Sequence, residues 1–127
     1  MQQRVAEMSQ GPIWNDYDVK IVSVGDGESI IDIPIKEEML QFHGSVHGGV
    51  LATVADMAMA AAVNSLVAEN EFTVTAELKV NYLRPATGNV LRANANVIKR
   101  GKTLTHCQCE VFDEHDKQVC FVVATFY

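Results

Sequence analysis

The chain has 127 residues, about the size of one domain, of which 48% are hydrophobic and 20% are charged. A chain of this length buries enough surface to hold a core without disulfides, and its composition excludes an intrinsically disordered protein. The net charge of -6 argues against a general nucleic-acid binder, because such proteins depend on a cationic surface.

The sequence gives no sign of a membrane or secreted location. Its N-terminal region has no apolar run of the kind found in signal peptides. The longest apolar stretch, residues 50–63, includes Asp56 and is too short to span a bilayer comfortably. Three cysteines, an odd number, do not make a disulfide framework. We therefore expect one domain over residues 1–127, in the reducing cytoplasm, without a membrane or nucleic-acid partner.

The first third of the chain has the pattern of a short helix followed by a β-hairpin. The first dozen residues favour a helix that ends before the Gly-Pro pair at 11–12. Residues 19–24 and 29–35 are rich in β-branched side chains and flank a Gly-Asp-Gly sequence, which is typical of a hairpin turn.

Residues 50–67 change in character and are predicted to form a long buried helix. Alanine, which has the highest helix propensity, recurs through this stretch. Apolar side chains cover nearly the whole circumference, so we expect protein on all sides of this helix.

After Asn70 the hydrophobic period returns to two, which indicates strands. The alternation over residues 74–82 predicts a strand with one buried face and places Thr75 on the polar face, away from the helix. Short connections favour antiparallel pairing of three more strands, at 90–98, 103–112 and 119–126. The predicted fold class is α+β, with an antiparallel sheet wrapped around one long central helix.

The segment between Gln41 and Asp56 carries the residues best suited to chemistry. Gly48 and Gly49 stand at the predicted helix start, where free N–H groups and the helix dipole favour an oxyanion. The alternative is that two glycines only permit a tight loop into the helix.

Asp56 is the only charged residue between Glu38 and Glu69. A buried carboxylate is costly unless it is paired or faces a cavity, and Asp is a poor helix former. One interpretation is therefore a general base or nucleophile, and the other is a carboxylate that meets solvent or a donor at a subunit contact.

Gly49 and Asp56 lie on nearly the same helix face, roughly 10 Å apart along the axis. Both would have to act within about 3 Å of one substrate carbonyl, which a single helix does not easily allow. If both act, this spacing predicts a homodimer in which Gly49 comes from one subunit and Asp56 from the other.

Three motifs follow one another along the chain: His47-Gly48-Gly49 followed by Ala55-Asp56, then Val80-Asn81-Tyr82-Leu83-Arg84-Pro85-Ala86, then Gly101-Lys102-Thr103. Together they resemble the hotdog-fold acyl-CoA thioesterases, especially the branch related to the phenylacetate-pathway and 4-hydroxybenzoyl-CoA enzymes. The resemblance covers residues 15–127 and implies a hotdog fold, but it does not specify the acyl group.

The resemblance also implies roles for individual residues. Asp56 matches the family's catalytic base or nucleophile, and Gly49 matches the backbone N–H that polarises the thioester carbonyl. Gln41 matches an assisting Asn or Gln, and Thr75 matches a Ser or Thr that orients the water or the carboxylate.

The loop before the helix has candidate substrate-binding residues as well. His47 and Gly48 belong to it, with His47 expected mainly to fix the turn, and His43 is an alternative to Gln41 for reaching the substrate. Cys107 and Cys109 share a strand face but lack a second ligand pair, so we expect no metal site.

The implied substrate is an acyl-CoA, so no separate cofactor is expected. The 32 residues between Glu77 and Glu110 carry six basic and no acidic side chains. Chance and solvated strand faces are one explanation, and a cationic surface for an anionic ligand is the other. In the second case the phosphates of CoA would meet basic residues at strand ends, namely Arg84, Lys99, Arg100 and Lys102.

The expected reaction is hydrolysis of an acyl-CoA by a homodimer, or by a dimer of dimers. Attack by an activated water and attack by Asp56 to form an anhydride both stay open. Two rival functions are a hotdog dehydratase or hydratase that pairs His47 with Asp56, and a non-catalytic acyl-CoA-binding module.

Overall fold

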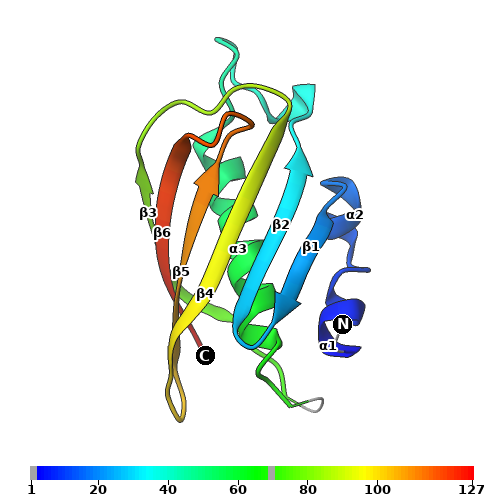
Figure 1. The fold of residues 1–127 in the computed structure, drawn as a ribbon, viewed down its shortest axis with the longest axis vertical. Helices are drawn as coiled ribbons and strands as arrows, with labels where there is room; N and C mark the ends of the chain where they lie inside the picture. Colours follow the sequence, from blue (N-terminus) through cyan, green and yellow to red (C-terminus); the bar gives the residue numbers. More distant parts are fainter. Residues whose placement is uncertain (1–2, 69–70) are drawn as a thin grey trace.

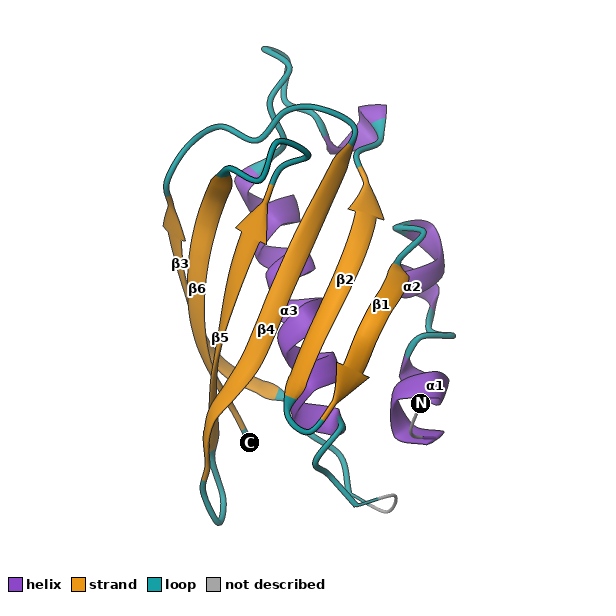
Figure 2. Ribbon diagram, in the orientation of Figure 1, coloured by secondary structure: helices purple, strands orange, loops and turns teal. Residues whose placement is uncertain are grey.

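A computed structural model describes residues 3–68 and 71–127 of the chain. Six antiparallel strands form one sheet in the order β1-β2-β4-β5-β6-β3, and the long helix α3 lies against one face of it (Figures 1 and 2). The elements are α1 (Gln3–Met8), α2 (Pro12–Asp16), β1 (Lys20–Gly25), β2 (Glu28–Pro34), a 3-10 helix (Glu37–Met39), α3 (Gly48–Asn64), β3 (Thr75–Tyr82), β4 (Val90–Arg100), β5 (Thr105–Phe112) and β6 (Gln118–Phe126).

This architecture confirms the predicted α+β class and its antiparallel sheet. The β1–β2 hairpin turns at Asp26 and Gly27, whose φ angles of 53° and 80° suit the tight turn that an Asp-Gly pair favours. The short helix α2 was not predicted, because the Gly-Pro pair was expected only to end a helix. Proline is also a favourable first residue of a helix, and Pro12 occupies that position in α2.

The helix α3 packs on the sheet through a broad apolar face. Residues on that face are fully buried, among them Val54, Ala58 and Met59. A stripe on the opposite side stays partly or fully exposed and consists of Gly49, Thr53, Asp56 and Ala60. The expectation of protein on all sides of this helix is therefore wrong for one chain, because the sheet covers only one side.

The edge strand β3 corrects the predicted orientation of Thr75. A β-bulge between Thr75 and Glu77 shifts the register, so that Thr75 pairs with Phe126 and Leu78 pairs with Ala124. Phe126 and Ala124 are both buried beneath α3, so Thr75 shares the helix-facing side of the sheet. The extra residue in the bulge reverses the alternation from which the polar face was predicted.

The two ends of the sheet carry different connections. The segment between β3 and β4 crosses the end at which α3 begins, and the β4–β5 hairpin closes the other end (Figure 1). Between these ends, Asp56 lies near the middle of α3. No helix in the described ranges is long and apolar enough to cross a membrane.

Candidate active site

Asp56 is held by a side chain from the edge strand. Thr75 Oγ1 donates a hydrogen bond to Asp56 Oδ1 across 2.7 Å. The second carboxylate oxygen, Oδ2, has no hydrogen-bond donor among the described residues. A carboxylate fixed at one oxygen and free at the other is arranged to accept a proton from, or to attack, a molecule beside it.

Asp56 opens onto a cavity of about 500 Å³ on the helix side of the sheet. Its wall combines polar groups near the carboxylate, such as Thr75, with apolar side chains, which are Met8, Ala60, Phe72, Val74 and Phe126. The guanidinium of Arg4 lies over the Phe72 ring, 4.7 Å from its centroid, so α1 forms part of this wall. Glu7, Asn64 and Thr73 also line it, so the cavity can take a group with apolar and polar parts next to the Asp56 carboxylate.

The start of α3 presents backbone donors. The N–H groups of Val50 and Leu51 both bond to the carbonyl of His47, at 3.0 and 3.2 Å. Within the described part of the chain, the N–H groups of Gly48 and Gly49 have no acceptor, and the His47 side chain makes no capping bond. A Cβ added at Gly49 would meet no atom within 4 Å, so its backbone is open to an approaching group.

Tyr82, at the end of β3, packs against Gly48. Its hydroxyl donates to the Gly48 carbonyl oxygen at 2.7 Å. A Cβ at Gly48 would stand only 3.1 Å from the Tyr82 ring, which explains glycine at this position. Partial burial raises the pKa of Tyr82 above its ordinary value, so the phenol stays protonated and able to donate near neutral pH.

A second cavity, of about 410 Å³, adjoins the helix start and is lined by Gln41, Gly48 and Tyr82 among others. The Gln41 amide has only long contacts to Ser45 Oγ and the Val46 carbonyl, at 3.4 and 3.5 Å. Its carboxamide is therefore free to reorient toward a ligand. His43 lines the same cavity, with Nδ1 3.2 Å from Ser45 Oγ, whereas His47 is exposed.

The structure brings some of the predicted site residues together and keeps others apart. Asp56 and Thr75 are in direct contact, and Gln41 and Gly48 line one cavity. Neither of these two cavities contains both Asp56 and Gly48. Along α3 the distance from Gly49 to Asp56 is roughly 10 Å, so the backbone donors at the helix start and the carboxylate lie well apart in one chain.

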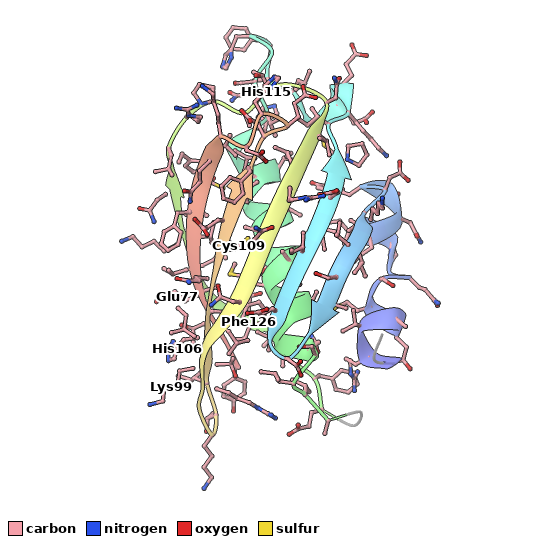
Figure 3. All side chains as sticks on the ribbon, in the orientation of Figure 1. Glu77, Lys99, His106, Cys109, His115 and Phe126 are labelled. Atoms are coloured by element: carbon pink, nitrogen blue, oxygen red, sulfur yellow. The ribbon has the colours of Figure 1, made fainter. Side chains whose placement is uncertain are left out.

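The predicted phosphate-binding residues are divided in the same way. Arg84 lines the cavity of Gln41 and Gly48. Arg100 and Lys102 line a small cavity of about 110 Å³, which shares Phe72 and Phe126 with the cavity of Asp56. Lys99 lies near the β4–β5 hairpin beside His106 (Figure 3). The basic stretch therefore does not form one continuous patch in a single chain.

The cysteines belong to the core beneath α3. Cys107, Cys109 and Cys120 are all buried and unpaired by disulfides. Burial raises the pKa of Cys120 to about 11, and burial together with the charge of Asp56 raises the pKa of Cys107 to about 12. Among the described residues, no group of three His, Cys, Asp or Glu side chains is placed to hold a metal ion.

Sequence reasoning missed two contributors to these cavities. Tyr82 belongs to a motif that was singled out, yet the alternation of the strand assigned its ring to the buried face. Phe72 precedes the predicted strand and has no motif around it, although it contributes an exposed aromatic ring beside the Asp56 cavity. The position of Tyr82 at the end of a strand was the one sequence feature that could have indicated its contact, because side chains at a strand end can reach a neighbouring loop.

Comparisons with known proteins identify the family of the chain. Residues 43–120 match the thioesterase superfamily. The acyl-coenzyme A thioesterase PaaI of Escherichia coli is 31% identical over 102 residues, which cover 80% of this chain and 71% of that protein. The 1,4-dihydroxy-2-naphthoyl-CoA hydrolase of Listeria monocytogenes is 26% identical over 102 residues, which cover 80% of this chain and 83% of the hydrolase.

Solved structures give the same result for the fold. A thioesterase family protein from Silicibacter pomeroyi superimposes with a TM-score of 0.92 and 29% identity, covering 98% of this chain and 94% of that one. The chain therefore belongs to the thioesterase superfamily, and its fold is the hotdog fold. By its family it is an enzyme that hydrolyses thioesters, as the resemblance implied.

Proposed function

We propose that the protein hydrolyses an acyl-CoA to a free acid and CoA at a site shared between two copies of the chain. The observation that carries this proposal is the carboxylate of Asp56, which accepts a hydrogen bond from Thr75 through Oδ1 and lines a cavity of about 500 Å³. The names of the relatives PaaI and 1,4-dihydroxy-2-naphthoyl-CoA hydrolase support a CoA thioester as the substrate.

In the proposed reaction, the thioester carbonyl oxygen accepts a hydrogen bond from Gly49 N–H at the positive end of α3. Gln41 lines the cavity beside the neighbouring Gly48 and assists in holding the carbonyl, so these residues with Gly49 form one half of the proposed site, and Asp56 with Thr75 forms the other half. Asp56 of the other subunit activates a water, or attacks the carbonyl itself to form an anhydride that water then opens. The C–O bond forms, the C–S bond breaks, and the proton taken from water returns to the CoA sulfur.

A second copy of the chain is proposed because one chain leaves the site incomplete and a wide surface uncovered. Exposed apolar side chains flank the edge strand β3, namely Phe72, Val74, Tyr82 and Leu83. The exposed stripe of α3 with Gly49 and Asp56 lies on the same side of the sheet as the two cavities. These apolar side chains lie at the two ends of β3, and an unpaired strand edge with exposed apolar side chains is a feature of association sites.

In the proposed shared site, basic residues that lie apart in one chain would bind the phosphates of the same CoA. Arg84 accompanies the half-site of Gly49, and Arg100 and Lys102 accompany the half-site of Asp56. When the Gly49 half of one chain meets the Asp56 half of the other in the proposed dimer, basic residues from both chains flank the same crevice. Lys99 is the remaining candidate for a CoA phosphate, at the hairpin end of the sheet.

The test is release of the CoA thiol from short, long and aromatic acyl-CoAs by the wild-type protein and by Asp56→Asn. The Asn side chain keeps the shape and removes the base, so we expect kcat to fall by about 10²–10⁴. Asp26→Asn is the matched control, because Asp26 lies in the β1–β2 turn at a positive φ angle that Asn also accepts. Turnover of Asp56→Asn at the wild-type rate, or no thiol release by the wild type from any of these substrates, would reject the proposal.

A further inference from the structure

The peptide group between Gly48 and Gly49 connects Tyr82 to the proposed oxyanion donor. Its carbonyl oxygen belongs to Gly48 and accepts the Tyr82 hydroxyl at 2.7 Å. Its N–H belongs to Gly49 and has no acceptor within the described residues. Because a peptide group is planar and conjugated, a hydrogen bond to its oxygen withdraws electron density from its nitrogen and fixes the direction of its N–H.

We propose that Tyr82 is a positioning residue that orients and polarises the Gly49 N–H, so that this donor binds the developing oxyanion more strongly. The inference rests on the proposed function, because it assumes that Gly49 N–H meets the thioester carbonyl. Tyr82 is not assigned a contact with the reacting atoms. It acts from β3, 34 residues along the chain, on the first turn of α3.

The packing around Tyr82 supports a fixed geometry. A Cβ on Gly48 would come within 3.1 Å of both the ring and the hydroxyl oxygen, so the tyrosine lies directly against this peptide. At Gly49, by contrast, the space beside the backbone is empty to at least 4 Å. One side of the glycine pair is thus closed by Tyr82, and the other is open for a substrate.

The expected size of the effect follows from the role. Loss of a whole oxyanion-hole donor costs about 10²–10³ in kcat, and cooperative polarisation strengthens a hydrogen bond by roughly 10–30%. Removing only the Tyr82 hydroxyl should therefore lower kcat by about two- to eightfold. KM should stay close to that of the wild type, because the oxyanion develops in the transition state.

The variant is Tyr82→Phe, which keeps the ring against Gly48 and removes the hydroxyl. Tyr17→Phe is the control, because Tyr17 lies at the end of α2, outside both half-sites. Kinetics are measured well below the unfolding temperature of each variant. A merely structural role for Tyr82 would lower that temperature and leave kcat unchanged.

A second measurement observes the peptide itself. Gly48-Gly49 is the only Gly-Gly pair in the sequence, so glycine labelled with carbonyl ¹³C and amide ¹⁵N gives one directly bonded ¹³C–¹⁵N correlation for this peptide. We expect Tyr82→Phe, but not Tyr17→Phe, to shift that correlation, because the hydrogen bond to the carbonyl is lost.

The outcomes separate this inference from the proposed function. A two- to eightfold loss of kcat at constant KM, with a shifted correlation, supports the inference. An unchanged kcat, a rise in KM without a fall in kcat, or a fall in kcat with an unmoved correlation would overturn it. If Asp56→Asn keeps full turnover, the proposed function fails by itself, whatever Tyr82→Phe does.

Discussion

Thr75 Oγ1 and Asp56 Oδ1 are joined by a 2.7 Å hydrogen bond that links the edge strand β3 to the middle of α3. A bulge at the start of β3 turns the Thr75 side chain toward the helix. Without the extra residue, Thr75 would face away from it. The bond restrains the carboxylate through Oδ1 and leaves Oδ2 without a donor among the described residues, beside a cavity that Asp56 lines. The proposed chemistry depends on that arrangement.

The first prediction concerns this bond. Thr75→Val keeps the β-branched shape and removes the hydroxyl, so the carboxylate loses a charge-assisted partner whose loss typically costs about 1.5–3 kcal/mol. We expect kcat for thiol release to fall by about tenfold or more, and Thr75→Ser, which restores the hydroxyl, to recover most of it. Wild-type kcat in the Val variant would show that Thr75 does not orient the base.

Gly49 leads to a second prediction, in which stability and activity move in opposite directions. Its position in the first turn of α3 requires no unusual backbone angle, and a methyl group there meets no atom of the same chain. Gly49→Ala should therefore raise the free energy of unfolding, by at most about 1 kcal/mol as measured in urea. The same methyl group should lower kcat/KM, because it occupies the approach to the N–H. Equal or higher activity in this variant would remove the reason given for glycine at position 49.

The third prediction is that alanine at Gly48, unlike alanine at Gly49, does not stabilise the fold. A methyl group at Gly48 would press on the Tyr82 ring and hydroxyl at 3.1 Å, so one of the two must shift. The helix propensity of Ala offsets part of this cost, so we expect the free energy of unfolding of Gly48→Ala to lie about 1–2 kcal/mol below that of Gly49→Ala, measured by the same urea titration. Combining Gly48→Ala with Tyr82→Ala, which empties the space, should restore part of that loss, and no recovery in the double variant would contradict the contact.

The buried thiols give a fourth prediction, on pH. The pKa values of Cys107 and Cys120 are raised to about 12 and 11, from an ordinary value of 9.0. The folded state thus holds these protons more tightly than the unfolded state, so stability should decrease as the pH rises above about 9. In urea titrations at pH 8 and pH 10, Cys120→Ser should reduce this alkaline loss relative to the wild type, and an identical loss in both proteins would argue against the assignment.

The same burial has a practical consequence for the thiol-release assay. The native protein should react very slowly with a disulfide reagent at pH 8, because its three cysteines are buried and protonated. In denaturant all three should react rapidly. Fast reaction of the folded protein would mean that the sheet beneath α3 opens readily.

Much of this fold was predictable because local patterns and tertiary packing agree. The Asp26-Gly27 turn defines the β1–β2 hairpin, and the alanines of α3 favour a helix that a sheet can approach closely. Asp56 was recognisable as a candidate because a carboxylate inside an apolar helix has few purely structural explanations.

The errors have physical causes that sequence alone does not display. The orientation of Thr75 depends on a one-residue bulge, which leaves no mark in a nine-residue alternation. The role of Tyr82 depends on Gly48, which lies 34 residues away and reaches it only in the folded chain. Apolar composition also does not distinguish a helix buried by its own chain from one with a side left open, and α3 has such a side.

The central claim, that each site combines Gly49 of one chain with Asp56 of another, is tested most directly by mixing two inactive variants. Asp56→Asn removes the base, and Gly49→Pro removes the N–H itself in the first turn of a helix, where proline is tolerated. Each variant alone should be nearly inactive. After joint unfolding and refolding, half of the dimers should be mixed, and each mixed dimer should hold one intact site, which restores about a quarter of wild-type activity. Mixed dimers that form, as verified with two affinity tags, but release no CoA thiol would contradict the shared site.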